Sequence, residues 1–473
     1  MAADRHEPPS VIFLIWRDER LNIVLVGAGR MGREIALRLA DEGHDITVVD
    51  NDPECLEQIA NSIDAMTLLG NGADYSVLSE SGVADADLLI AVTNDDAVNM
   101  LCCLSGKKMG VKNTVARVRT MEYFRQMVFL KDELGLSLVL NPEQAAAAEI
   151  SRILRFPSAA KVDSFAKGRA EMVEHTVAEG CPLCGLRLDH LRGKLSNGIL
   201  IAVVERGKDV LIPRGDFVIQ QGDVIHVVGA PSAISGFFKE IGAYKRSVRN
   251  VMLLGGGRIS LYLVNYLTGA GIKVKIIERS EAHCETLKEV IPKAEILLGD
   301  GTDPRVLEEE GIRSADAFVA LTGSDQNNII TGMFAQRSGV GKVVVKVNED
   351  SFRLMAGDAK LDSFVLPKNS AAEIIVSYVR GMQHSIDAVG IESLHDIAYG
   401  KAEVLEFSIN GDAPNLGVPI KDLHIRRDTL IAAIIRGYQC IIPGGNDTME
   451  KNDTVIAVTT KFGMRGFADI FEG

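Results

Sequence analysis

Aromatic residues, cysteines and long apolar runs are all scarce in this sequence. Phe, Trp and Tyr together make up 5% of the 473 residues. The cysteines are seven in number and scattered, which excludes a fully disulfide-paired framework and is typical of a reducing cytoplasm. They are Cys55, Cys102, Cys103, Cys181, Cys184, Cys284 and Cys440.

No stretch of about 20 apolar residues is present, so the sequence predicts no membrane-spanning helix. The apolar run Val11 to Trp16 is far too short to cross a bilayer and lacks the length and cleavage site of a signal peptide. Residues 1–20 are interpreted as an N-terminal extension, either disordered or added by a start codon placed too early. We expect a cytoplasmic protein that reaches a membrane only through a partner.

Acidic residues outnumber basic ones, and the formal net charge is -13. A phosphate backbone is recognised mainly by Lys and Arg, and no basic stripe offsets the acidic balance, so we exclude a nucleic-acid-binding function. The composition, with 47% hydrophobic and 24% charged residues, is that of a globular protein. The length predicts about three domains.

The stretch Leu21 to Asp50 contains a strand, a glycine-rich turn, a helix and a second strand. Its turn has the pattern G-x-G-x-x-G and consists of Gly27, Ala28, Gly29, Arg30, Met31 and Gly32. The first glycine permits the tight turn, the second lets backbone N–H groups approach a pyrophosphate, and the third lets the helix pack closely on the strand. The N-terminus of the helix presents the positive end of its dipole to a phosphate.

Asp50 ends the second strand, where a carboxylate can accept hydrogen bonds from an adenosine ribose. An acid at this place disfavours a 2′-phosphate. The expected cofactor is therefore NAD(H) or another adenine nucleotide, rather than NADP.

The chain repeats itself after about 230 residues. Asn250 to Glu278 copies Asn22 to Asp50, so Gly255 matches Gly27 and Glu278 matches the ribose-binding acid. Asn328 likewise matches Asn99. A repeat of this length predicts that each copy is a folding unit with its own core.

Each copy opens with short apolar strands that alternate with amphipathic helices, which is typical of a doubly wound parallel sheet. In the first copy we predict strands near 22–26, 45–49, 64–69, 87–92, 112–118 and 136–140. The remainder of each copy has strands with few helices between them, which predicts a small α+β module. These strands are 172–176, 199–205, 209–212 and 223–228, then 404–409, 430–436, 439–442 and 454–458.

The predicted fold class is α/β, a tandem duplication of a Rossmann-like sheet domain followed by an α+β module. The nucleotide-binding domains are placed at residues 21–142 and 249–366, and the helix with its small module at 143–243 and 367–473. Pro142 can begin an alanine-rich helix from Glu143 to Arg155, and its counterpart runs from Pro367 to about Arg380. Such a helix either covers its own sheet or pairs with another subunit, and both alternatives stay open.

Residues for catalysis or metal binding are not evident. The Cys181–Cys184 pair has C-x-x-C spacing but lacks two further zinc ligands. We find no Tyr-x-x-x-Lys pair, nucleophile elbow, Walker A loop or paired metal ligands. Several histidines are isolated and do not recur in both copies: His175, His190, His226, His384, His395 and His424. The sequence predicts nucleotide binding without turnover, with no catalytic residue and no metal site.

The motifs GAGRMG, LLGNGAD, AVTND and ARVR, together with Asp50, resemble the tandem RCK domains of the TrkA family, the cytoplasmic regulators of Trk-type potassium uptake. The resemblance runs from Leu21 to the C-terminus. It implies a homo-oligomeric ring, typically a tetramer, beneath a membrane-embedded potassium transporter subunit. NAD(H), ATP and ADP change the shape of such a ring, because a ligand shifts an equilibrium by its differential affinity for two states.

The resemblance also assigns residues to the first nucleotide site. Gly27 to Gly32 hold phosphates, Asp50 holds the ribose and Asp74 lies near the adenine. The other assigned residues are Thr93 and Asn94, which line the cleft, and Arg117 and Arg119, which meet additional phosphate charge. The structural alternatives are that Asp74 caps the next helix and that Arg117 pairs with a carboxylate.

A second site is predicted from the matching residues of the second copy. They are Gly255, Gly256, Gly257, Arg258, Ile259, Glu278 and Thr322. This copy departs from the pattern, because Ser260 replaces the last glycine, and Gly323, Lys346 and Asn348 replace Asn94, Arg117 and Arg119. We therefore predict a site that binds an adenine nucleotide but holds extra phosphate less well.

Two functions from different classes stand side by side. The favoured one is a regulatory subunit that senses nucleotides and gates a potassium transporter. The alternative is an NAD-dependent oxidoreductase with duplicated nucleotide-binding domains, which the missing acid/base group disfavours. A ring that serves another cation channel or antiporter would share every motif named above.

Overall fold

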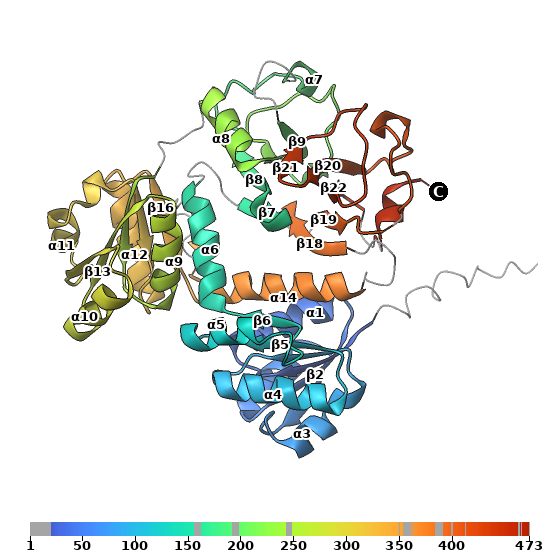
Figure 1. Ribbon diagram of the computed structural model, residues 1–473. Helices are drawn as coiled ribbons and strands as arrows, with labels where there is room; N and C mark the ends of the chain where they lie inside the picture. Colours follow the sequence, from blue (N-terminus) through green and yellow to red (C-terminus); the bar gives the residue numbers. More distant parts are fainter. Residues whose placement is uncertain are drawn as a thin grey trace, which may run out of the picture. The chain divides into compact units, whose positions relative to one another are not determined.

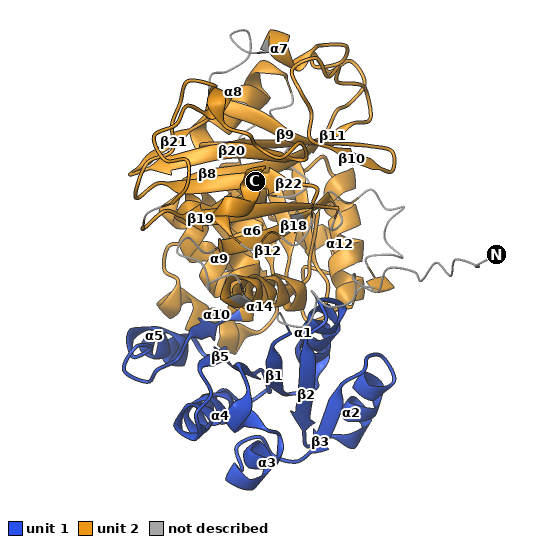
Figure 2. Cartoon of the chain, turned by 90° about the vertical axis from the view of Figure 1, so that its right-hand side faces the viewer, with its two compact units in different colours: residues 1–141 blue, residues 142–473 orange. Residues whose placement is uncertain are grey.

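The computed structural model describes residues 20–155, 162–191, 198–242, 248–349, 351–352, 361, 363–383, 391–398, 401–411, 413–461, 464 and 466–472. Residues 1–19 of the predicted extension, and His384, lie outside the described residues. The chain divides into two compact units, residues 1–141 and 142–473 (Figure 2). None of the helices within the described ranges combines the length and apolar character needed to cross a bilayer.

Unit 1 contains a six-stranded parallel sheet, because its strands are short, apolar and separated by helices (Figure 1). The strand order is β3-β2-β1-β4-β5-β6. The strands are β1 (Asn22–Val26), β2 (Asp45–Asp50), β3 (Met66–Leu69), β4 (Leu88–Ala91), β5 (Asn113–Arg117) and β6 (Leu138–Leu140). This order is that of a doubly wound nucleotide-binding sheet, and it confirms the predicted fold class.

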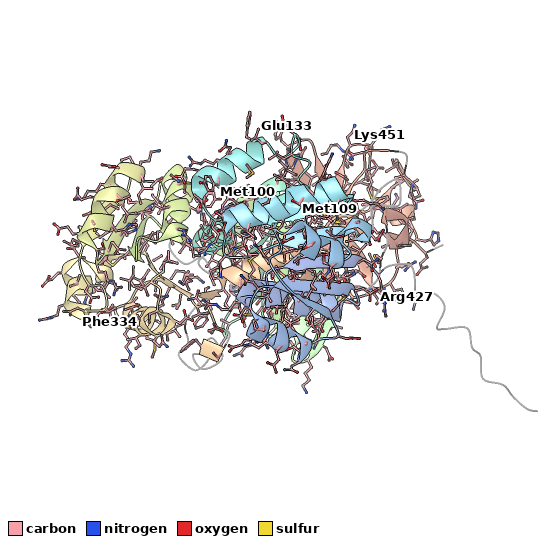
Figure 3. All side chains as sticks on the ribbon, turned by 90° about the horizontal axis from the view of Figure 1, so that it is seen from below. Met100, Met109, Glu133, Phe334, Arg427 and Lys451 are labelled. Atoms are coloured by element: carbon pink, nitrogen blue, oxygen red, sulfur yellow. The ribbon has the colours of Figure 1, made fainter. Side chains whose placement is uncertain are left out.

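The helices of unit 1 follow the strands as predicted. They are α1 (Arg30–Asp41), α2 (Pro53–Ala60), α3 (Tyr75–Glu80), α4 (Asp96–Met109) and α5 (Met121–Phe129). Val24, Val26 and Leu89 from the sheet pack with Cys102 and Cys103 of α4 in one buried cluster. Partly buried residues of α4 extend this cluster, among them Met100 and Met109 (Figure 3).

Unit 2 contains a second parallel sheet with the order β14-β13-β12-β15-β16-β17, the same pattern as in unit 1. Its strands are β12 (Asn250–Leu254), β13 (Lys273–Glu278), β14 (Glu295–Leu298), β15 (Ala317–Ala320), β16 (Lys342–Lys346) and β17 (Ser363–Val365). Its helices include α9 (Arg258–Gly269), α10 (Glu281–Val290), α11 (Pro304–Glu309) and α12 (Asp325–Arg337). Phe334 of α12 packs against the core of this sheet (Figure 3).

Two antiparallel sheets, one from each copy, complete unit 2. The first has the order β10-β9-β11-β8-β7 and the second β18-β19-β22-β20-β21. The first comprises β7 (Val162–Phe165), β8 (Ala170–Thr176), β9 (Ile199–Arg206), β10 (Asp209–Leu211) and β11 (Val224–Gly229), with α7 (Leu188–Leu191) and α8 (Pro231–Glu240) beside it in sequence. The second comprises β18 (Ile391–Ile397), β19 (Ala402–Ser408), β20 (Thr429–Arg436), β21 (Gln439–Ile441) and β22 (Thr454–Thr459).

The two antiparallel sheets share one apolar core. Met172 and Val228 of the first sheet belong to the same buried cluster as Val404 and Ile456 of the second. Arg169 also donates a hydrogen bond of 2.7 Å to the carbonyl oxygen of Gly437. The two small modules therefore pack face to face within the chain.

The predicted alanine-rich helices are confirmed as α6 (Pro142–Arg155) and α14 (Pro367–Gln383). Helix α6 packs against α9 of the second parallel sheet and against α14. Ser370 on α14 donates a hydrogen bond of 2.6 Å to the Glu149 carboxylate on α6. The α6 helix of the first copy thus covers an element of the second copy.

Candidate functional site

The glycine-rich turn of unit 1 lies where strand order reverses, because β1 has β2 on one side and β4 on the other. Gly27 follows β1 with a φ of 109°, a conformation that favours glycine. A Cβ atom on Gly27 would lie 2.9 Å from the backbone nitrogen of Thr93, which follows β4. The turns after β1 and β4 therefore meet at the carboxyl edge of the sheet, where open α/β sheets bind their ligands.

The three glycines of the turn differ in what surrounds them. A Cβ atom on Gly32 would lie 1.8 Å from the carbonyl oxygen of Gly27, so the close packing of α1 on the turn requires glycine there. A Cβ atom on Gly29 would meet nothing within 4 Å. The space beside Gly29 is therefore open for a ligand to approach the backbone.

Helix α1 begins differently from α2, α3 and α4, although α5 also has no side-chain hydrogen bond at its N-cap. Gly29 is its N-cap, no side chain caps it, and its first turn has no acidic residue. By contrast, Asp52, Asp74 and Asp95 cap α2, α3 and α4 with side-chain hydrogen bonds. The uncapped N-terminus of α1 offers backbone N–H groups and a positive dipole end to an anion such as a pyrophosphate.

Asp50 holds the glycine-rich turn from the end of β2. Its Oδ2 accepts a 2.5 Å hydrogen bond from the backbone N–H of Ala28, and its Oδ1 accepts one of 2.9 Å from Asp52. The half-buried carboxylate therefore lies at the carboxyl edge beside the turn. This position fits a role as an acceptor for ribose hydroxyl groups.

Asn99 on α4 fixes the second turn of the site. Its Oδ1 accepts hydrogen bonds of 2.8 and 2.7 Å from the backbone N–H and hydroxyl of Thr93. Its Nδ2 donates to the carbonyl oxygens of Thr93 and Arg117 at 3.1 and 2.9 Å. The Asn99 side chain is fully buried, so this network sets the shape of the turn after β4.

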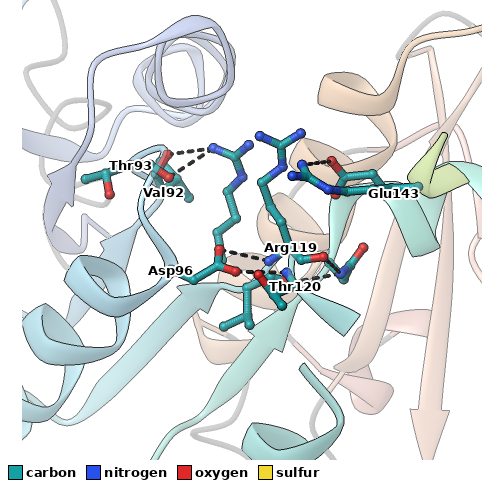
Figure 4. Close-up of polar contacts among 10 residues, drawn as sticks. Val92, Thr93, Asp96, Arg119, Thr120 and Glu143 are labelled. Atoms are coloured by element: carbon teal, nitrogen blue, oxygen red, sulfur yellow. Dashed lines mark hydrogen bonds and ion pairs between the residues drawn. The ribbon is translucent and has the colours of Figure 1, made fainter. Parts of the chain in front are cut away.

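Arg117 lies in this network, with its guanidinium Nη1 donating to the carbonyl oxygens of Val92 and Thr93 at 3.2 and 3.1 Å (Figure 4). Asp96 accepts hydrogen bonds of 2.9 and 2.8 Å from the backbone N–H groups of Arg119 and Thr120 (Figure 4). Burial acts to raise the pKa of Asp96, but these hydrogen bonds and the Arg117 charge outweigh it and lower the pKa. The negative charge of Asp96 therefore helps to hold the chain after β5.

The remaining predicted residues of the first site lie around these turns. Asp74 caps α3 by accepting 2.8 Å hydrogen bonds from the backbone and hydroxyl of Ser76, which lower its pKa. Asp74 therefore caps the next helix, which was the structural alternative predicted from the sequence, and the residue is exposed. Arg30 and Asn94 are exposed, whereas Ala28 and Met31 are buried.

The second copy rebuilds the same arrangement. Gly255 has a φ of 96°, and nothing lies within 4 Å of a Cβ atom on Gly257, the uncapped N-cap of α9. Glu278 accepts hydrogen bonds from the backbone N–H groups of Gly256 and Ser280 at 2.9 and 3.0 Å. Thr322 donates its hydroxyl to Asn328 at 2.6 Å, as Thr93 does to Asn99.

Side chains of the second copy contact its own glycine-rich turn. The Ser260 hydroxyl donates to the carbonyl oxygen of Gly255 at 2.6 Å, and His283 Nε2 lies 3.0 Å from the carbonyl oxygen of Gly256. The guanidinium Nη1 of Arg258 lies 3.8 Å from the Glu143 carboxylate on α6.

The other residues predicted or compared at the second site lie near these contacts. Ile259 is buried, and Asn348 Nδ2 donates to Asp325 at 2.8 Å, while Lys346 ends β16.

The TrkA-N domain profile matches residues 23–142 and 251–367, and the TrkA-C domain profile matches residues 172–242 and 404–472. These segments cover most of the chain. The chain belongs to the TrkA family. A Trk system potassium uptake protein TrkA from Halomonas elongata is 32% identical over 442 residues, which cover 92% of this chain and 95% of that protein.

A further relative agrees with this family, and solved structures share the fold. The TrkA protein of Vibrio alginolyticus is 30% identical over 92% of this chain and 95% of its own length. A structure described as the GsuK channel bound to NAD is 18% identical, covers 94% of this chain and 78% of its own, and has a TM-score of 0.61. The GsuK RCK domain covers 94% and 93%, with 17% identity and a TM-score of 0.60. These structures share the fold of this TrkA-family chain.

Several residues at the two TrkA-N sites were not predicted from sequence. Asn99 and Asn328 hold the turns after β4 and β15, and their recurrence in both copies was a usable signal. His283 and Glu143 gave no such signal, because their contacts with the second glycine-rich turn depend on packing between elements far apart in sequence.

Proposed function

We propose that this chain is a nucleotide-sensing regulatory subunit of a Trk-type potassium uptake system. The observation that carries the proposal is the pair of helices, α1 and α9, that begin at uncapped glycines beside an acid at the end of the neighbouring strand. Each such arrangement fits the pyrophosphate and ribose of an adenine dinucleotide. The names of the TrkA relatives support the link to potassium uptake.

The proposed ligand is NAD(H), with ATP or ADP as the alternative adenine nucleotides. Backbone N–H groups at Gly29 and Gly257 would face the phosphates, and Asp50 and Glu278 would accept from the ribose. A structural relative with the same fold is described as bound to NAD, which supports a dinucleotide as the ligand. In our proposal the nucleotide binds without being consumed.

The proposed mechanism is a shift between conformations of a homo-oligomeric ring, a tetramer, attached to a membrane-embedded potassium transporter subunit at the inner face of the cell membrane. A nucleotide shifts such an equilibrium only if it binds one state more tightly than the other. The two glycine-rich turns are suited to this, because each is bonded to the acid of its own sheet. A ligand that bonds the same acid would change how the turn is held.

The deciding experiment is calorimetric titration of the full chain with NADH, NAD, ATP and ADP, with Asp50→Asn and Glu278→Gln as a matched pair. Each variant keeps a side-chain acceptor for the turn but removes the charge. We expect saturable binding, a site lost or weakened in each variant, and tighter ATP binding at the first site. Steady oxidation of NADH with a small carbonyl substrate would instead support an oxidoreductase.

A second measurement tests the transport link. The chain and its transporter partner are reconstituted in liposomes, and potassium flux is followed with and without nucleotide. We expect nucleotide-dependent flux that disappears in the Asp50→Asn variant. Potassium flux that is the same with and without nucleotide, in the wild type and in the variant, would refute the regulatory role.

A further inference from the structure

A cluster of three potential metal ligands lies in the first antiparallel sheet, which contributes no residue to the proposed nucleotide sites. Glu174 on β8, Glu205 on β9 and His226 on β11 place one ligand atom each within 4.8 Å of one another. His226 Nε2 lies 2.8 Å from Glu205 Oε1. His226 is isolated along the sequence, but strand pairing brings Glu205 and Glu174, which are distant in sequence, to its side.

Sheet register places all three side chains on one face. Glu174 pairs directly with His226, and Glu205 pairs with Val224, two residues along β11. Side chains two residues apart on a strand share a face. Because Met172 and Val228 belong to the core between the two small modules, the cluster continues that same inward face.

The duplicate module shows that this polar set is not required by the fold. Strand pairing places Glu406, Ile456 and Ile435 where the first module has Glu174, His226 and Glu205. Ile435 and Ile456 are buried in the core shared by the modules. Apolar residues therefore suffice at two of these positions, while the first module buries a histidine that is 2% exposed. Burying a polar group where an apolar one fits costs stability unless it has a partner or a function.

The chemistry of the three groups matches a transition-metal cation. Two carboxylates and one imidazole are the ligand types of zinc sites that have three protein ligands and keep a fourth position for water. An imidazole ligand favours zinc over calcium or magnesium, which prefer oxygen. Tetrahedral bonds of about 2.0 to 2.2 Å separate ligand atoms by roughly 3.3 to 3.5 Å, a distance within the range spanned by this cluster. Partial exposure of the Glu205 side chain, 13%, leaves a route for the ion.

We propose that Glu174, Glu205 and His226 form a divalent transition-metal site, with zinc as the fitting ion, in the first small module. The ion would join β8, β9 and β11 on the face that packs against the second module. The ion would bind His226 Nε2 and Glu205 Oε1 in place of the hydrogen bond between them, and the proton of that bond would move to Nδ1 of the imidazole or be released to solvent. The site is independent of the nucleotide sites.

The test is zinc titration of the chelator-treated full chain in competition with a chromophoric chelator. We expect one tight zinc ion per chain, at least tenfold weaker binding in His226→Gln and in Glu205→Gln, and unchanged binding in the control His190→Gln, an exposed histidine of the same module. Zinc should raise the Tm of the wild type and of the control only. Equal zinc binding in all four proteins, or no zinc binding, would overturn the proposal.

Two further measurements separate the alternatives. Cobalt bound at this site should give visible absorption bands and no thiolate-to-metal charge-transfer band. A charge-transfer band that disappears in the Cys181→Ser/Cys184→Ser variant would place the metal at the two thiols and refute the proposed site. If His226→Gln fails to fold, Glu174→Gln provides the same comparison, and NADH binding by each variant reports whether its nucleotide domains are intact. NADH binding that fails in every protein while zinc binds as expected would refute the nucleotide proposal alone.

Discussion

Replacing Gly29 by alanine separates nucleotide binding from folding at the first site. Gly29 has a φ of -64° and a ψ of -175°, which alanine adopts without strain, and its added Cβ would meet no protein atom within 4 Å. The alanine should therefore leave stability nearly unchanged, since any gain from a less flexible unfolded chain, up to about 1 kcal/mol, opposes a small loss at the N-cap. The methyl group would stand where our proposal places a phosphate.

The expected loss of affinity follows from the hydrogen bond that the methyl group blocks. A hydrogen bond to a charged group contributes about 1.5 to 3 kcal/mol, so NADH should bind roughly 10- to 150-fold more weakly. Calorimetry measures the Kd, and thermal melting should show a Tm within about 4 °C of the wild type.

Gly32→Ala is the contrasting change, because its Cβ would lie 1.8 Å from the carbonyl oxygen of Gly27 and would force the backbone to move. We expect it to cost about 1 to 3 kcal/mol of stability as well as affinity. Gly257→Ala is the matched change at the second site, where the Cβ again meets nothing within 4 Å. Wild-type NADH affinity in both Gly29→Ala and Gly257→Ala would refute phosphate binding at these turns.

Three other changes test the remaining contacts. Asn99→Ala should lower the free energy of unfolding by about 1 to 3 kcal/mol, because it leaves buried polar groups of the turn after β4 without hydrogen-bond partners. Asn328→Ala should have the same effect in the second copy. An unchanged Tm in both variants would contradict this. A double-mutant cycle of Glu143→Gln and Arg258→Gln should give a coupling free energy of unfolding of at most about 1 kcal/mol, because the two charged groups are 3.8 Å apart and Arg258 is largely exposed. A larger coupling would mean that the ion pair is desolvated. Burial raises the pKa of Glu406, so its ionisation opposes folding. Glu406→Gln should therefore stabilise the chain increasingly as pH rises above about 4.3, the ordinary pKa of glutamate. Thermal melting at acidic and neutral pH measures this, and an equal effect of the substitution at both pH values would contradict it.

The parallel sheets were predictable because their signals are local. Each glycine-rich turn follows an apolar strand directly, and the duplication supplies a second copy of each parallel strand. Strands β7 and β18 were not predicted. Strand β7 has only four residues, and β18 mixes acidic residues and a histidine with apolar ones, so neither has a clear alternation.

Contacts between distant segments could not be predicted from periodicity. The sequence offered two roles for the alanine-rich helix, covering its own sheet or pairing with another subunit. Neither describes the contact of α6 with α9, in which α6 covers an element of the other copy within the same chain. Likewise, Glu205 and His226 are 21 residues apart and meet only because β9 and β11 are neighbours in the sheet. Local patterns define the elements, whereas the pairing of elements decides which side chains meet.

The two proposed nucleotide sites differ in the side chains that contact the glycine-rich turn. Both copies leave the space beside the second glycine of the turn open and have an exposed arginine after it, but in the first copy Gly32 has no side chain to contact the turn. In the second, Ser260 and His283 contact carbonyl groups of the turn, and Arg258 lies near a buried carboxylate on α6. A phosphate that recruits Arg258 must compete with this ion pair, which at about 1 kcal/mol would weaken binding roughly fivefold. The same competition would connect the second site to α6. A nucleotide at the second site would therefore bind more weakly than one at the first site, but it would change the contact of Arg258 with α6 and so affect the packing of unit 2 more directly.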